Sequence, residues 1–259
     1  MLERRLLLTL VLAGCSSGGG NADSARTRTL DTTRAATAPD SVEAVTARAP
    51  RAIALPFRAR GNEPGWSLDV GEREMTLLAD YGERRVVAPT PPATTSGDTT
   101  RWAARAQDHE VLVTVVDRLC HDVMSGFPFP RTVVVRLDGR ELRGCGGESV
   151  EVLLGAQWTV ADIEGATVPK DSASTLLFGA DGRLSGRAPC NGFGASYELK
   201  GEDLAFSELS TTRMQCPPVV MQREQRFLAV LGEVRRFERR AGDTLILRTE
   251  DGRAITAHR

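Results

Sequence analysis

The sequence predicts a mainly β protein in two folded parts: a small antiparallel β-barrel or sandwich, then an α+β domain with one helix on an antiparallel sheet. From residue 57 onward, short segments of alternating apolar and polar residues are separated by turns rich in Gly, Pro and Asp, which is the pattern of antiparallel strands. A helical period occurs directly after Pro217 and Pro218. Because 259 residues suffice for two domains, we place these at residues 57–150 and 154–259.

Residues 1–15 have the features of an export signal. Arg4 and Arg5 precede an apolar run, residues 6–13, that is far shorter than the roughly 20 residues of a membrane-spanning helix. The run ends in Leu-Ala-Gly-Cys15, which resembles the bacterial lipobox. This resemblance implies that Cys15 is lipidated, with acyl chains such as palmitate, and that the protein is held in a membrane. The alternative is an ordinary signal peptide or a weak anchor with an incidental cysteine.

Residues 16–56 are expected to form a disordered tether. They are dominated by Ser, Gly, Thr, Ala, Asp and Arg without a sustained apolar period, so they bury too little surface to offset the entropy of ordering. A helix over residues 41–48 is the weaker alternative. Ser16, rather than Asp, follows the cysteine, and the lipobox resemblance then implies the periplasmic face of the outer membrane as the destination.

The first folded part is expected to contain antiparallel strands only. A turn at residues 61–65 leads Trp66 into the first of them, a hairpin turn lies at Asp138-Gly139, and residues 89–97 are expected to be a surface loop. Closing such short strands into a barrel would remove their exposed edges. The predicted strands are residues 66–70, 75–79, 84–88, 101–106, 111–116, 132–137 and 141–143.

The second folded part combines strands with the helix. Val220, Glu224, Phe227, Leu228 and Leu231 share one side of that helix, which Gly232 is able to end. Turns are expected at residues 181–182, 191–192 and 250–252. The predicted strands are residues 158–163, 175–178, 183–187, 193–199, 204–207, 234–237, 244–248 and 254–257.

Four cysteines remain beyond Cys15, namely Cys120, Cys145, Cys190 and Cys216. An even number in an exported protein predicts disulfides, because that compartment is oxidising. Four cysteines allow three pairings. Proximity in sequence and the division into two domains favour Cys120 with Cys145 and Cys190 with Cys216.

The C-terminal part resembles the META domain of HslJ-like bacterial lipoproteins. The residues that carry the resemblance are Cys190-Asn191, the run Thr-Arg-Met-Gln-Cys at 212–216, the helix with Glu224, the leading Trp158 and the hairpin at 178–186. Ala188-Pro189 departs from the small residues expected before Cys190. The resemblance implies an envelope lipoprotein domain linked to heat-shock and drug-tolerance phenotypes, without established catalysis.

The first part loosely resembles an uncharacterised domain of exported proteins. The matching segments are Gly61-Asn62-Glu63-Pro64 with Trp66, residues 120–126, Phe129-Pro130 and residues 144–147. This resemblance implies no activity.

Chemical functions find little support in the residue pattern. Cys120-His121-Asp122 would suit an activated thiolate, but neighbours on a strand point to opposite faces and Cys145 offers a disulfide partner. Zinc would require paired Cys or His ligands at short spacing, and the sequence contains no such pair. We therefore expect a protein that is not an enzyme and has no cofactor and no metal. The net charge of −1 also disfavours a nucleic-acid partner.

Several polar residues remain as candidates for structural or binding roles. Glu63, Asp122 and Glu224 are expected to be solvated or to cap backbone groups. Asn191 is expected to supply a left-handed turn with Gly192, with ligand recognition as the alternative. Together with Arg213 and Met214, it is a candidate for a binding edge, although Met more often fills a core.

The predicted function is a non-enzymatic, lipid-anchored envelope protein that acts in binding or stress tolerance. The alternative is an inhibitor of a periplasmic or host hydrolase such as lysozyme, and an enzyme ranks third. A loop presenting Ser or Lys to a cleft would favour the inhibitor, whereas a deep pocket lined by carboxylates or His would favour the enzyme. The oligomeric state is open.

Overall fold

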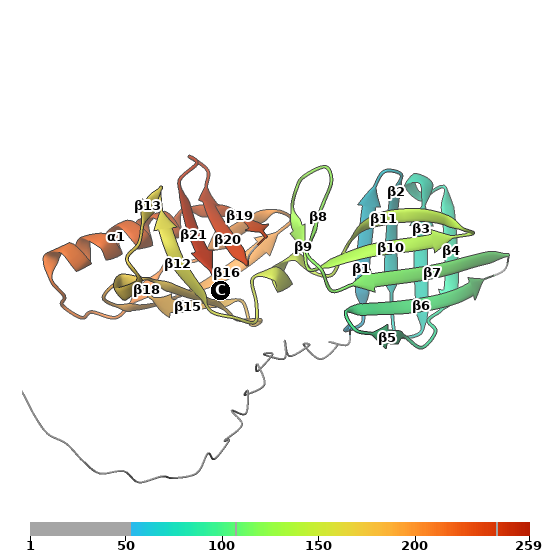
Figure 1. The fold of residues 1–259 in the computed structure, drawn as a ribbon, viewed down its shortest axis with the longest axis horizontal. Helices are drawn as coiled ribbons and strands as arrows, with labels where there is room; N and C mark the ends of the chain where they lie inside the picture. Colours follow the sequence, from blue (N-terminus) through green and yellow to red (C-terminus); the bar gives the residue numbers. More distant parts are fainter. Residues whose placement is uncertain (1–52, 107, 242) are drawn as a thin grey trace, which may run out of the picture. The chain divides into compact units, whose positions relative to one another are not determined.

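A computed structural model describes residues 53–106, 108–241 and 243–259 (Figure 1). The structure is mainly β with one α-helix, and its antiparallel sheets curve into a half-barrel and a nearly closed barrel, so the predicted fold class is confirmed. All of these described residues belong to one compact unit. The predicted signal segment with Cys15 and residues 16–52 of the predicted tether lie outside the described residues. In the part that is described, no helix is long and apolar enough to cross a membrane.

The first sheet has nine antiparallel strands in the order β4-β3-β2-β1-β11-β10-β7-β6-β5. Alternation places one face of each strand inside; in β7, for example, Val111, Val113 and Val115 are buried. Asp138 and Gly139 both have positive φ at the predicted hairpin turn. The strands are β1 (Phe57–Asn62), β2 (Gly65–Val70), β3 (Glu74–Ala79), β4 (Arg84–Pro89), β5 (Thr94–Ser96), β6 (Thr99–Ala106), β7 (His109–Val116), β10 (Arg131–Leu137) and β11 (Arg140–Gly146).

Three features of this sheet depart from the expectation. The predicted loop at residues 89–97 contains β5, a short polar strand that pairs with β6 and whose side chains are all exposed. Strand β1 was not predicted, and Ile53 and Leu55 ahead of it pack against the core although they belong to the segment expected to be tether. A separate two-stranded ribbon, β8 (Cys120–His121) with β9 (Pro128–Phe129), is too short to produce a periodic signal.

The second sheet has ten strands, of which eight follow the order β17-β16-β15-β14-β12-β21-β20-β19. β13 pairs with β12 and β18 pairs with β16. The strands are β12 (Trp158–Ile163), β13 (Ala166–Thr167), β14 (Thr175–Phe178), β15 (Arg183–Arg187), β16 (Gly192–Lys200), β17 (Asp203–Phe206), β18 (Ser210–Thr211), β19 (Val234–Arg240), β20 (Thr244–Thr249) and β21 (Ala254–His258). Three short 3₁₀ segments complete the described elements: η1 (Asp80–Gly82), η2 (Ser149–Val152) and η3 (Lys170–Ser172).

The helix α1 (Pro218–Gly232) follows the predicted pattern. Pro218 occupies the first helical position, where a missing N–H costs no intrahelical bond. Its buried residues are Glu224, Phe227, Val230 and Leu231, spaced so that they share one side. A polar residue among them, Glu224, therefore requires partners within the protein.

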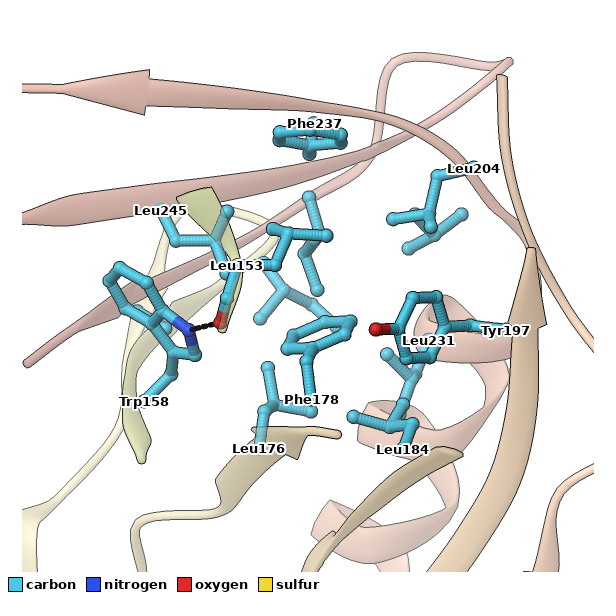
Figure 2. Packing of buried hydrophobic residues seen from close by; sticks show 14 of the residues in the cluster. Leu153, Trp158, Leu176, Phe178, Leu184, Tyr197, Leu204, Leu231, Phe237 and Leu245 are labelled. Atoms are coloured by element: carbon cyan, nitrogen blue, oxygen red, sulfur yellow. Dashed lines mark hydrogen bonds between the residues drawn. The ribbon is translucent and has the colours of Figure 1, made fainter. Parts of the chain in front are cut away.

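Large apolar side chains from the second sheet and α1 form its core (Figure 2). Trp158 is fully buried and its indole Nε1 donates a hydrogen bond of 2.9 Å to the carbonyl oxygen of Leu153, drawn as a dashed line in Figure 2. Phe178 packs edge-on against Tyr197, with ring centroids 5.3 Å apart. Phe129 of β9 and Phe127, just before that strand, belong to the same apolar cluster.

We predict that Gly186→Ala lowers the free energy of unfolding by about 1–3 kcal/mol, measured by chemical denaturation. A Cβ at Gly186 would lie 2.0 Å from the Thr175 carbonyl oxygen and 2.6 Å from the Phe193 ring. Gly194→Ala on the adjoining strand is the matched control, because its Cβ would meet no atom closer than 3.6 Å. Equal stability losses in the two variants would contradict this account of the packing.

Candidate functional site

Both predicted disulfides are present. Cys120 bonds to Cys145 and Cys190 bonds to Cys216, with Cα atoms 5.5 Å and 6.1 Å apart. The second bond joins the approach to β16 with the segment just before α1. In the chain-entropy description, closing a loop of this length contributes roughly 3 kcal/mol.

Asn191 is the centre of a buried hydrogen-bond network, and the expected left-handed turn is wrong. Non-glycine residues with left-handed backbone occur elsewhere among the described residues, and Asn191 is not among them. Its Nδ2 donates to Glu224 over 2.6 Å, while its Oδ1 accepts from the Thr212 hydroxyl at 2.8 Å and from the Met214 N–H at 2.7 Å. The side chain therefore bridges α1 and the segment that carries the second cysteine.

Glu224 satisfies the other end of this network. One oxygen of its carboxylate accepts from the backbone N–H groups of Cys190 and Asn191, at 2.9 Å and 2.7 Å, and the other accepts from Nδ2 of Asn191. Burial raises the pKa of Glu224, but these three hydrogen bonds outweigh it and hold the pKa below the ordinary value of 4.5. The carboxylate is thus charged and caps the turn that leads into β16, in agreement with the capping role expected for it.

Arg213 and Met214 lie in the exposed segment that this network holds in place. Met214 is 52% exposed, although its backbone N–H is fixed by Asn191, and Val219 nearby in sequence is 54% exposed. Arg213 is also exposed. Of the three binding candidates, the structure therefore places Arg213 and Met214 on the surface and buries Asn191 beneath them.

A second carboxylate–amide pair joins the two motifs of the first part. Nδ2 of Asn62 donates to Asp122 over 2.8 Å, and the same carboxylate accepts from the N–H groups of Met124 and Ser125, both at 3.0 Å. Partial burial raises the pKa of Asp122, and the bonds from Ser125, Asn62 and Met124 together lower it below its ordinary value. The role of Asn62 was not predicted from the sequence, where its place in the Gly-Asn-Glu-Pro motif was the available signal.

The segment Cys120-His121-Asp122 has no geometry for thiolate activation. Cys120 is bonded to Cys145, and Nε2 of His121 lies 2.7 Å from the backbone carbonyl oxygen of Arg239, to which it donates. Asp122 faces Asn62 and its own loop.

Glu63, the remaining candidate carboxylate, accepts from the Tyr81 hydroxyl at 3.4 Å. Within residues 53–106, 108–241 and 243–259, no group of three or more His, Cys, Asp or Glu is placed to hold a metal ion.

These features define a class: a disulfide-stabilised, mainly β protein whose C-terminal half has a helix and a cystine-bearing turn joined by a buried carboxylate. Residues 151–259 match the META domain family, and this part of the chain is a META domain. An NMR structure of a protein from Burkholderia xenovorans is 28% identical, over 43% of this chain and 86% of that one, with a TM-score of 0.37. A second NMR structure is 24% identical, over 41% of this chain and 91% of that one, with a TM-score of 0.34. No curated protein matches the chain.

We predict that Glu224→Gln lowers the free energy of unfolding at neutral pH by about 2–4 kcal/mol, measured by urea denaturation. The amide keeps the size of the side chain but loses the charge, and its NH₂ group cannot accept from the donors that the carboxylate satisfies. Glu208→Gln, a charge change at an exposed position, is the control and should leave stability within about 0.5 kcal/mol of the wild type.

The same pair of variants tests the pH dependence of the network. Because folding lowers the pKa of Glu224, its contribution is complete above its ordinary pKa of 4.5 and is lost as the pH falls through the folded-state value. The gap in stability between the wild type and Glu224→Gln should therefore narrow in acid, while the gap to Glu208→Gln should stay small. A gap that is unchanged from neutral to strongly acidic pH would contradict a charged Glu224.

Proposed function

We propose that the protein is a non-enzymatic, lipid-anchored component of the cell envelope that serves as a binding or stress-tolerance module. The observation that carries the proposal is the META domain at residues 151–259. The lipobox-like end of residues 1–15 supports lipidation at Cys15 and a place on the periplasmic face of the outer membrane. Two disulfides are in keeping with that oxidising compartment.

The candidate binding edge is the segment that presents Arg213 and Met214. A buried amide and carboxylate fix its backbone, so binding would cost little ordering entropy. Met214 and Val219 add exposed apolar surface, and Arg213 adds charge. Exposed Met and Arg together are typical of protein-binding surfaces.

A non-enzymatic role is supported by the state of the candidate catalytic groups. Glu224 and Asp122 hold backbone N–H groups, and Cys120 is oxidised. Each of these side chains is therefore engaged in stabilising a turn or a loop.

Inhibition of a hydrolase such as lysozyme is the second candidate, and one loop bears on it. The loop between β8 and β9 projects Val123 and Met124, whereas the hydroxyl of Ser125 is bound to Asp122 and to the N–H of Phe127. The projecting side chains are thus apolar rather than the Ser or Lys that would enter a hydrolase cleft. This observation favours the binding module over the inhibitor.

We predict that Cys15→Ala releases the protein from the membrane fraction, because the apolar run before it is too short to span a bilayer. Immunoblots of membrane and soluble fractions measure the release. The matched control is Ser16→Ala, which leaves the cysteine in place and should stay with the membrane. Full retention of Cys15→Ala would contradict anchoring through this residue.

We predict that the double change Arg213→Ala and Met214→Ala weakens capture of an envelope partner about tenfold, the order of magnitude for loss of an interface anchor. The measurement is crosslinking and pull-down of the full chain from envelopes, with lysozyme as one of the preys. Leu177→Ala, which removes an exposed apolar side chain from β14, is the control. Equal capture by both variants would exclude the Arg213–Met214 edge.

A further inference from the structure

Val123 and Met124 are the most exposed large apolar residues that the structure describes. Their exposed fractions are 80% and 77%. They lie side by side in sequence at the tip of the loop between β8 and β9, which projects from the ribbon in Figure 1. Contiguous exposed apolar side chains mark sites of protein or membrane interaction, whereas single scattered ones are ordinary.

The loop is rigidly presented. Asp122 binds the N–H groups of Met124 and Ser125 and the hydroxyl of Ser125, and it is itself held by Asn62. Backbone hydrogen bonds between Asp122 and Phe127, and between Gly126 and Asp122, close the loop at its base. The Cys120–Cys145 disulfide fixes the first strand of the ribbon. The apolar tip is therefore ordered before any partner arrives.

The base of the same loop lines a hollow of about 460 Å³ that is rich in arginine. His121, Ser125 and Gly126 line it from the side of the loop, and β19 and β20 contribute four arginines and one glutamate. The charged residues of the lining are Arg236, Arg239, Arg240, Arg248, Glu202 and Glu238. Four arginines against two glutamates leave the lining of the hollow with a net positive charge.

The arginines are unequally compensated. Arg236 and Arg248 are direct cross-strand neighbours, an arrangement in which like charges repel. Glu238 pairs with Arg240 and Arg248, whereas no ion pair to Arg236 occurs among the described residues. The buried Arg239 is bound separately by Asp243. The guanidinium of Arg236 is thus the group best placed to receive an anion.

We infer that this loop and hollow bind the surface of an anionic phospholipid bilayer. The arginines receive lipid phosphate, which matches the guanidinium fork, and Val123 and Met124 enter the boundary between headgroups and acyl chains. Adjacent cationic and apolar groups are the combination that interfacial membrane binding requires. The inference rests on the proposed lipid anchor, which keeps the loop near a bilayer. It adds that the protein is oriented with this loop against the bilayer surface, which the anchor alone does not determine.

The test places an indole at the tip with Met124→Trp in the full lipidated chain, bound to vesicles of phosphatidylglycerol and phosphatidylethanolamine. The three native tryptophans are at most 5% exposed, so the introduced indole is the one that senses the surroundings. We expect its emission to shift to the blue and to be quenched by lipids with brominated acyl chains. Leu177→Trp, on the exposed face of β14, is the matched control and should be unaffected.

The charge requirement is tested in the Met124→Trp background. Arg236→Gln should raise the phosphatidylglycerol content needed for half-maximal quenching, with an apparent affinity about fivefold weaker. Arg236→Lys, which keeps the positive charge, should retain most of the apparent affinity for the vesicles. Arg101→Gln, an exposed arginine on β6 of the first sheet, should have no effect.

The outcomes separate this inference from the anchor. If the lipidated chain stays on the vesicles while the indole remains in water, the anchor stands and the lipid-binding loop is wrong. If the Cys15→Ala chain leaves the membrane fraction in cells but its indole is still quenched at high phosphatidylglycerol, both proposals stand. An indole that is shielded only when envelope proteins are added would identify a protein surface and overturn the inference.

Discussion

The META domain depends on the hydrogen bonds that the buried carboxylate of Glu224 accepts. It lies on the inner side of α1, receives three hydrogen bonds from Cys190 and Asn191, and turns the amide oxygen of Asn191 toward Thr212 and Met214. A helix, the start of a strand and an exposed segment are thereby held by one charge. Its burial is tolerable because each hydrogen bond to an ionised group offsets part of the desolvation cost. The neighbouring disulfide closes the same turn covalently.

The first folded part of the chain contains a similar arrangement in a more exposed setting. Asp122 takes the place of Glu224 and Asn62 that of Asn191, and the loop they hold also lies beside a disulfide. In both cases a carboxylate satisfies backbone N–H groups that a tight turn leaves unpaired. The shared outcome is a rigid surface loop carrying a methionine, Met214 in one case and Met124 in the other. Rigid loops on a β scaffold are the usual position for binding residues.

The sequence predicted the elements that a local residue pattern specifies, and it missed features that depend on contacts between residues far apart in the chain. Alternation located β12, β14 and β15 to the residue, and proline with a 3.6-residue period located α1. Strand β5 was missed because three polar residues give no alternation. Asn191 was misinterpreted because Asn-Gly is a turn signal, whereas its partner Glu224 lies 33 residues away. The position of Arg236 beside the loop of Val123 likewise depends on tertiary contacts that no local pattern contains.

The balance of charge explains why a local cluster, rather than the whole protein, would select a membrane. A net charge of −1 provides no long-range attraction to anionic lipid. At physiological ionic strength the screening length is about 8 Å, so only arginines close to the bilayer contribute. The proposed membrane contact therefore depends on the arginines that line the hollow beside His121, because they share it with the base of the loop that carries Val123 and Met124. The apolar tip is insensitive to salt and the arginines are not, so the two contributions to membrane binding are separable by ionic strength alone.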